Sequence, residues 1–377
     1  MEWKEVRLGD IATMQYGKLA PKKKDAGNVP IFTGYKNVGY TDKINCNKNT
    51  IVVVARGVGG CGDVKITNED CYLTNLAISV SLNAQICVPM FFYYLHQLEN
   101  LSILNSGSAQ PQITIESLTK YSFRIPSLDD QRRIASILSS LDRKIELNDK
   151  INADLEEMAQ AIFKNWFVDF EPFKDGKFVD SELGMIPEGW KVGTLGDITK
   201  NKSAKVKERN DVKVLSPVTT GELVLSEEYF TKQVFSSSIA KYKIVNKGDF
   251  AYNPARVNIG SLGRNEFDFD GCVSPVYVVF SVLDGYENYF DLFRKTDFFK
   301  DSVASLAIGG VRQSLSYDDL SSIEVIIPSE NAVEEFNNLY NQMKKTIKAN
   351  KLENSRLSLL RDTLLPRLMS GEIEVPQ

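Results

Sequence analysis

The chain has only one histidine, His96, among its 377 residues. A histidine-based catalytic triad would have to use that residue, but no G-x-S-x-G segment or other nucleophile context accompanies it. Residues 91–96 (FFYYLH) instead predict a buried helix in which His96 is structural. The five cysteines show no C-x-x-C spacing. They therefore predict neither a zinc site nor a disulfide framework, and they fit a reducing compartment.

Long apolar runs and nucleotide-binding signatures are also missing. No run of about 18 apolar residues predicts a membrane span, and the first residues lack the basic start and apolar core of a signal peptide. No G-x-x-x-x-G-K-[ST] segment is present. Residues 57–62 fit G-x-G-x-x-G, but residues 63–67 look extended where a dinucleotide fold needs a helix. We therefore expect a cytoplasmic, non-catalytic protein with no membrane contact, no metal and no cofactor.

The sequence contains an internal repeat. Trp3-Lys4 and the LGDI segment at residues 8–11 return as Trp190-Lys191 and residues 195–198, at an offset of 187. Later the offset becomes 202, since Pro126 corresponds to Pro328. The 15-residue slip between these offsets lies in the middle of each copy. Ends that match around centres that differ indicate one scaffold that carries two different recognition surfaces.

Each copy is expected to be an α+β globular domain followed by a long helix. Short β-type runs such as residues 50–54 and 276–280 are separated by Gly, Asn and Asp, as turns require. Each domain ends at a proline and gives way to a helical pattern. We place the globular domains at residues 1–127 and 187–328, and the helical segments at 128–186 and 329–377.

Both helical segments follow strict 4,3 spacing, which puts one stripe of each on a coiled-coil seam. The first stripe comprises Ile134, Leu138, Leu141, Ile145, Asn148, Asn152, Leu155, Ala159, Ile162 and Trp166. The second comprises Phe336, Tyr340, Met343, Ile347, Asn350, Asn354, Leu357, Arg361, Leu364 and Leu368. The paired central asparagines weaken packing but fix register. We predict an antiparallel coiled coil of roughly 60 Å with a pseudo-twofold axis. The alternative is that each helix packs only on its own domain.

Basic residues cluster at similar distances after each LGDI segment, although the formal net charge is −4. Such clusters can be solvated loops, but their repetition favours phosphate contact. The members are Lys18, Lys22, Lys23 and Lys24 in the first copy, and Lys200, Lys202, Lys205, Lys207 and Arg209 in the second. Two domains at opposite ends of a rod would suit separated segments of one long ligand, and duplex DNA is the obvious candidate.

Arginine beside glycine also recurs, because Ala55-Arg56-Gly57 aligns with Ala255-Arg256 at an offset of 200, followed by Asn258 and Ser261. A guanidinium can bond two acceptors of a phosphate or guanine at once; an exposed hairpin arginine is the alternative. The loops that precede the helices contain glycine and glutamine, which suit close backbone approach and an adenine edge, although structural turns explain them equally well. Their candidate residues are Ser106, Gly107, Gln110, Gln112, Arg312 and Gln313.

With these features together, the chain resembles a specificity subunit of a type I restriction–modification system over nearly its whole length. The segments that carry the resemblance are the two Trp-Lys…Leu-Gly-Asp-Ile starts, residues 107–113 (GSAQPQI), residues 125–135, residues 162–170 (IFKNWFVDF) and residues 364–373 (LLPRLMSGEI). The loop at residues 310–314 departs from the family's usual Gln-Pro type.

The resemblance implies two target recognition domains, each of which reads one half of a bipartite double-stranded DNA target, with the coiled coil setting the spacer. It further implies two S-adenosylmethionine-dependent methylation subunits docked on the coils, and two ATP-driven restriction subunits reached through the complex. On this basis we add base or groove contacts at Tyr35, Lys36, Asn37, Thr74, Asn75 and Ser274.

Two other classes stay open. One is a scaffold or regulator that binds methylation subunits without reading DNA. The other is the recognition part of a related single-chain restriction enzyme, which the absence of methyltransferase and nuclease motifs disfavours.

Overall fold

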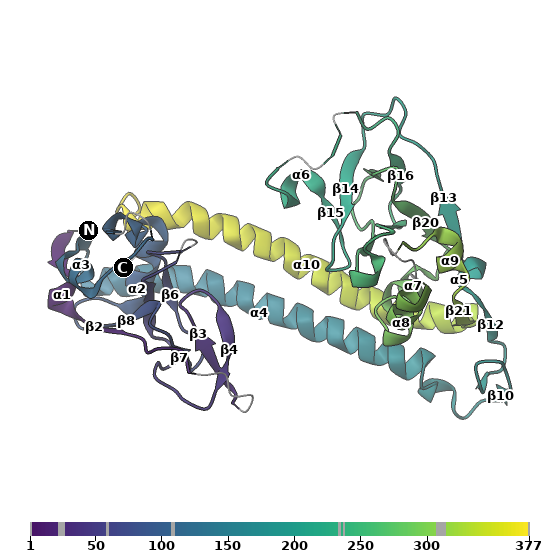
Figure 1. Ribbon diagram of the computed structural model, residues 1–377, viewed down its shortest axis with the longest axis horizontal. Coiled ribbons are helices and arrows are strands. Elements are labelled where there is room, and N and C mark those ends of the chain that lie inside the picture. Colours follow the sequence, from purple (N-terminus) through teal and green to yellow (C-terminus); the bar gives the residue numbers. More distant parts are fainter. Residues whose placement is uncertain are drawn as a thin grey trace. The chain divides into compact units, whose positions relative to one another are not determined.

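The computed structural model describes residues 2–21, 27–57, 60–106, 110–232, 235–236, 238–306 and 314–375. The chain forms two compact units (Figure 1). Unit 1 consists of Met1–Lys150 and Ala349–Gln377, and unit 2 of Ile151–Lys348. The two long helices, α4 (Leu128–Phe167) and α10 (Glu330–Met369), each contribute one half to each unit. Within the described ranges, no helix combines the length and apolar content that crossing a bilayer requires.

Unit 1 is a mixed α+β domain. Its strands are β1 (Lys4–Arg7), β2 (Ala12–Tyr16), β3 (Val29–Phe32), β4 (Asn37–Thr41), β5 (Ile51–Val54), β6 (Val64–Ile66), β7 (Tyr72–Leu73), β8 (Ala77–Leu82) and β9 (Ser122–Ile125). Its short helices are α1 (Leu8–Ile11), α2 (Pro89–Leu98), η1 (Leu101–Leu104) and α3 (Ile115–Lys120). Extended residues 64–66 after the glycine-rich loop agree with the expectation that no dinucleotide fold begins there.

Unit 2 has the same kind of composition. Its strands are β10 (Phe178–Val179), β11 (Ile186–Pro187), β12 (Lys191–Thr194), β13 (Thr199–Lys202), β14 (Lys213–Pro217), β15 (Leu223–Leu225), β16 (Lys243–Val245), β17 (Phe250–Tyr252), β18 (Leu262–Arg264), β19 (Gly271–Val273), β20 (Val278–Val282) and β21 (Glu324–Ile327). Its short helices are η2 (Glu171–Phe173), α5 (Leu195–Ile198), α6 (Ser226–Tyr229), η3 (Val257–Ile259), α7 (Glu287–Phe293), α8 (Asp297–Leu306) and α9 (Tyr317–Ser321).

The sheets of the two units follow one plan. Strand order β2-β8-β5-β6 in unit 1 matches β13-β20-β17-β18 in unit 2. A second sheet, β4-β3-β7, matches β15-β14-β19, and in both the last pair is parallel. The two-stranded ladder β1-β9 likewise matches β12-β21. The repeat in the sequence is therefore also a repeat in strand pairing.

Hydrogen bonds connect the two offsets of the repeat. The Leu8 amide donates to the Tyr121 carbonyl at 2.8 Å, and the Leu195 amide donates to the Ile323 carbonyl at the same distance. Leu8 and Leu195 are related by the early offset of 187, and their acceptors, Tyr121 and Ile323, by the later offset of 202. The LGDI turn of each copy is thus fixed to the segment just before its long helix, which explains why those two parts of the sequence match best.

One predicted equivalence needs correction. Ile51 pairs with Val80, whereas Phe250 pairs with Phe280. Ala12 and Thr199, which are related by the offset of 187, pair with Leu82 and Val282, so β8 and β20 are related by an offset of 200. Strands β5 and β17 are therefore related by an offset one residue shorter. Arg56 therefore corresponds in strand register to Ala255, and Arg256 lies one residue further along. Ladder pairing decides this register, and similar local sequence does not reveal it.

The long helices complete the core of each unit. In unit 1, Ile134 and Leu138 of α4 share a buried apolar cluster with Leu365 and Leu368 of α10. In unit 2, Phe163 and Phe167 of α4 contact Phe336 of α10. Ser127 begins α4, because its hydroxyl accepts the amide of Asp130, as an N-cap does. Each half of each helix is consequently held by the apolar core of a domain.

Both tryptophans of the repeat lie beside the segment that follows a long helix. Trp190 contacts the rings of Phe167, Phe170 and Phe173 at the end of α4. Trp3 lies against Gly371, just after α10, where a Cβ would meet the indole nitrogen at 3.0 Å. Gly371 has a φ of +76°, so two constraints favour glycine there.

Candidate nucleic-acid interface

In unit 1 several of the predicted contact residues lie in one connected set of loops. Lys18 bridges to Thr74, and the Asn75 amide donates to the Lys18 carbonyl at 2.9 Å. The Thr74 amide in turn donates to the carbonyl of Phe32, at the end of β3. The turn that follows β3 carries exposed Tyr35. The loops at residues 18, 33–36 and 74–75 are thus held together by backbone hydrogen bonds.

A second group of candidate residues lies beside the turn that carries Tyr35. Gly57 lies against the ring of Tyr35, because a Cβ built on Gly57 would meet that ring at 3.9 Å. Arg56 bridges to Gln112, whose carbonyl accepts the amide of Ser106 at 3.0 Å. The Lys36 ammonium lies 5.7 Å from the centre of the Tyr35 ring. The structure therefore brings together candidates from five separate segments of unit 1, with the Arg56 side chain exposed at the surface.

Some candidates of unit 1 have structural contacts instead. Thr74 is only 2% exposed, so its side chain supports the loop rather than offering itself to a ligand. The Asn37 side-chain oxygen accepts the amide of Gly39, which shapes the start of β4. Gln110 is exposed. Lys22, Lys23, Lys24 and Gly107 lie outside the described residues.

In unit 2 the basic cluster is divided between paired and unpaired side chains. Lys202 forms an ion pair with buried Asp249 at 2.7 Å. Burial raises the pKa of the Asp249 carboxyl, against the opposing effect of Lys202. Arg209 pairs with Asp211 and Asp270. Lys205 and Lys207 are exposed and have no ion pair within the part of unit 2 that the structure describes. These two lysines, rather than Lys202, remain suitable for phosphate contact.

The other candidates of unit 2 gather around the end of β17. Arg256 is exposed and precedes η3. Asn258 is exposed within η3. Ser261 is 1% exposed and its hydroxyl donates to the carbonyl of Pro217, so it holds the loop in place. Arg312 and Gln313 lie outside the described residues.

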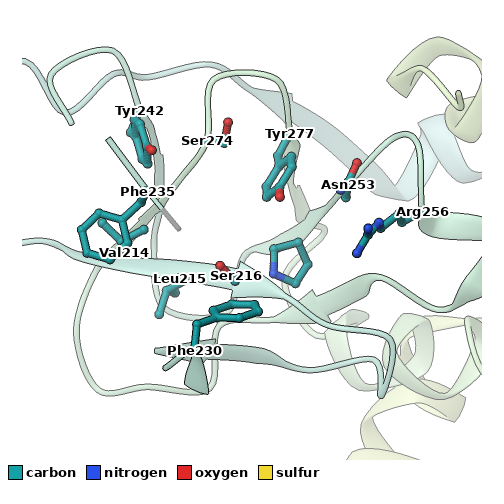
Figure 2. Close-up of a pocket in the computed structure, with 11 residues that line it drawn as sticks. Val214, Leu215, Ser216, Phe230, Phe235, Tyr242, Asn253, Arg256, Ser274 and Tyr277 are labelled. Atoms are coloured by element: carbon teal, nitrogen blue, oxygen red, sulfur yellow. The ribbon is translucent and has the colours of Figure 1, made fainter. Parts of the chain in front are cut away.

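A hollow of about 150 Å³ opens beside Arg256 (Figure 2). Its polar lining includes Asn253, Arg256, Ser216 and Ser274, and its aromatic lining is Phe230, Phe235, Tyr242 and Tyr277. Figure 2 shows the Tyr277 ring on one side and Phe230 on the other. The sequence prediction included Arg256 and Ser274 but none of the aromatic residues, because those residues come from separate segments with no common motif.

Chemistry within the described residues is limited. No group of three or more His, Cys, Asp or Glu side chains there is arranged to hold a metal ion. His96 is 2% exposed; one ring nitrogen lies 2.7 Å from the Phe92 carbonyl and the other 3.3 Å from the Tyr121 hydroxyl. Burial lowers its pKa to about 4. These contacts agree with the structural role expected for His96.

All of the predicted seam residues of α4 and α10 are buried or half-buried. Asn148 is 0% exposed, and its amide donates to Glu353 at 2.7 Å and to Asn354 at 2.9 Å. The Asn354 amide donates to Asp149. Nearby, Arg361 pairs with Asp142 at 2.8 Å, and Asp142 also accepts the hydroxyl of Tyr94 from α2. This polar network lies entirely within unit 1.

Comparison with known proteins finds specificity subunits of type I restriction–modification systems. Residues 1–157 match the family model described as a type I restriction modification DNA specificity domain. The specificity subunit of the type I restriction enzyme HindI from Haemophilus influenzae is 26% identical, and the match covers 99% of this chain and 100% of the relative. The chain is therefore similar, over its whole length, to a type I restriction–modification specificity subunit.

Further relatives show the same similarity. The MjaIX specificity subunit of Methanocaldococcus jannaschii is 28% identical, over 77% of this chain and 70% of the relative. A crystal structure of a type I restriction–modification S subunit from M. genitalium superimposes with a TM-score of 0.65. That match covers 97% of this chain and 96% of the other at 19% identity. At such identity the structural likeness shows a shared fold.

Proposed function

We propose that this chain is the sequence-recognition subunit of a type I restriction–modification complex, and that it acts on DNA in the cytoplasm without catalytic activity of its own. Each unit reads one half of a bipartite double-stranded DNA target. The observation that carries the proposal is the duplicated domain in a chain that aligns with a specificity subunit from end to end. The target recognition domains are residues 1–127 and 187–328.

The loops described above are the proposed reading surfaces. Phosphate contact falls to the basic clusters, which position a protein on DNA without specifying sequence. In unit 1 exposed Arg56, whose backbone bridges to Gln112 and whose neighbour Gly57 lies against Tyr35, is suited to a base edge, since a bidentate arginine distinguishes guanine in the major groove. In unit 2 the corresponding role falls to Arg256 and Asn258. Arg312 and Gln313 are retained from the family pattern.

We further propose that α4 and α10 form an antiparallel coiled coil that sets the distance between half-sites. In unit 1 a later residue of α4 pairs with an earlier residue of α10, as an antiparallel arrangement requires. Asp142 pairs with Arg361, whereas Asn148 pairs with Asn354. In unit 2, Phe163 near the end of α4 meets Phe336 near the start of α10. Two methylation subunits dock on this coil and the segments that follow it, and two restriction subunits join through the complex.

The function is tested by co-expressing the chain with the methylation subunit of its own system and mapping modified adenines across the host genome. The expected result is a two-part motif with a fixed gap that disappears when this chain is omitted. Exchange of one target recognition domain should change one half of the motif only. Association with the methylation subunit without any defined modified sequence would contradict the proposal and favour a scaffold that does not read DNA.

The coil is tested separately by cross-linking between introduced cysteines. Lys144→Cys and Glu353→Cys replace a pair whose charged atoms lie 3.3 Å apart and should join readily, whereas Lys144→Cys with exposed Arg356→Cys should not. With Asn148→Leu and Asn354→Leu added, both cysteine pairs should cross-link, because a buried polar residue specifies register and its apolar replacement relaxes it. Equal cross-linking of both pairs without the leucines would contradict a fixed register.

A further inference from the structure

The hollow in unit 2 combines aromatic rings with polar groups that form no hydrogen bond to any residue that the structure describes. The Arg256 guanidinium, the Asn253 amide nitrogen and the Tyr277 hydroxyl form no hydrogen bond or ion pair to any described residue. The Ser274 hydroxyl likewise forms no hydrogen bond to any described residue. Four polar groups around one small space, backed by aromatic rings, are a binding site for a planar molecule that carries hydrogen-bonding edges.

The walls of the hollow are fixed by the fold. Ser216 and Pro217 lie on β14, and the Ser216 hydroxyl is 2.7 Å from that of Ser226 at the start of α6. Tyr242 accepts the amide of Ser236 with its hydroxyl. The backbone carbonyl of Tyr277 accepts the Lys243 ammonium at 2.6 Å, which anchors the residue while its ring borders the hollow. The site is therefore held by three separate strands and loops.

Unit 1 has no room at the equivalent place. By strand register, Ala77 occupies the position of Tyr277. The turn after β3 lies directly on it, because a Cβ built on Gly34 would meet Ala77 at 3.0 Å and Val54 at 3.1 Å. Gly34 also has a φ of +99°. The shared scaffold thus closes this space in one unit and leaves it open in the other.

We propose that the hollow of unit 2 captures one nucleobase that leaves the stack when its half-site is bound. This inference rests on the proposed function, which places DNA against the loops that contain Arg256 and Ser274. Aromatic rings supply a stacking surface that accepts any base, and convergent donors read its hydrogen-bonding edge. Arg256 is exposed at the edge of the hollow, where its guanidinium is placed to bond the edge of the captured base.

Capture of a base means that unit 2 recognises its half of the DNA target differently from unit 1. Unit 1 is left with contacts to base edges in an intact duplex, whereas unit 2 combines such contacts with one unstacked nucleotide. An unstacked base is favoured at flexible pyrimidine–purine steps, so the half-site read by unit 2 should include one at the captured position.

The test uses the full chain and duplexes that carry the mapped target, with a fluorescent analogue of the local base, such as 2-aminopurine for adenine, placed in turn at each position of the unit 2 half-site on either strand, apart from the adenine that becomes methylated. Binding should raise fluorescence strongly at one position, because stacking between neighbouring DNA bases quenches the analogue and a base in the hollow has left those neighbours. Tyr277→Leu should abolish that rise and weaken binding roughly 5- to 150-fold, the loss expected for one base–aromatic stack. Tyr277→Phe should keep both. Phe298→Leu, at an exposed aromatic residue outside the hollow, is the matched control.

The outcomes separate the two proposals. Tight binding to the mapped target with no fluorescence rise at any position would overturn base capture and leave the proposed function intact. A rise that survives Tyr277→Leu, in a protein with an unchanged melting temperature, would also overturn it, because the base would then be unstacked without entering the hollow. If no bipartite target is found by methylation mapping, both proposals fail together.

Discussion

The pH dependence of stability is a direct test of how His96 is buried. It is the only histidine in the chain, so no other side chain has an ordinary pKa near 6.5. Burial between α2 and the aromatic pair Tyr121 and Phe123 lowers the pKa of His96 to about 4. Unfolding returns it to about 6.5. The unfolded chain therefore binds a proton between these values that the folded chain does not.

The sign and size of the effect follow from this difference. Because the folded-state pKa is depressed, the stabilisation is fully present above pH 6.5 and is lost as the pH falls towards 4. At pH 5 the loss is about 2 kcal/mol, and below pH 4 it approaches ~3 kcal/mol, at 1.36 kcal/mol for each pKa unit. The neighbouring Tyr121, whose pKa burial raises to about 12, stays neutral throughout this range.

The assay is denaturant unfolding of the wild-type chain and the His96→Gln variant at pH 7 and pH 5. The variant cannot titrate, so it should lose about 2 kcal/mol less stability than the wild type over that interval. Carboxyl groups such as Asp249, whose pKa is raised by burial, contribute equally to both proteins. An identical loss in wild type and variant would refute the reasoning and show that His96 is hydrated or protonated in the folded state.

Three further predictions follow from particular contacts. Asp291→Ala should destabilise the chain by about 3–5 kcal/mol in denaturant unfolding, because it leaves Arg294 buried and unpaired. The control Asp297→Ala removes an exposed ion pair with Lys300 and should cost at most ~1 kcal/mol. Equal losses of stability in the two variants would contradict the burial argument. Arg56→Ala should relax specificity at one half-site by ~1–3 kcal/mol in methylation mapping, and unchanged half-site preference would remove Arg56 from the reading surface. Burial raises the pKa of Cys87 to about 12 and of Cys272 to about 11, so both thiols should resist a thiol reagent at pH 8 until denaturant is added; rapid labelling of the native chain would show that they are accessible.

Much of the architecture could be predicted because it depends on local pattern. The 4,3 spacing of α4 and α10 places every predicted seam residue on a buried or half-buried face. The aromatic run before His96 predicted a buried helix, and α2 is that helix. The repeated LGDI turns predicted equivalent elements, and Leu8 and Leu195 donate equivalent hydrogen bonds. In each case residues close in sequence are sufficient to determine the outcome.

Long-range contacts decided the features that the sequence left open. The offset of β5 from β17 depends on ladder pairing, so the apparent match of Arg56 with Arg256 is displaced by one residue. Ser261 and Lys202 looked available as ligand contacts, but Pro217 and Asp249, distant in sequence, bind their side chains. The sequence by itself determined the repeat, the helices and the resemblance to type I specificity subunits. Only the tertiary structure decided which polar groups are paired and where Phe230, Tyr242 and Tyr277 meet around one space, because these depend on segments that folding alone brings together.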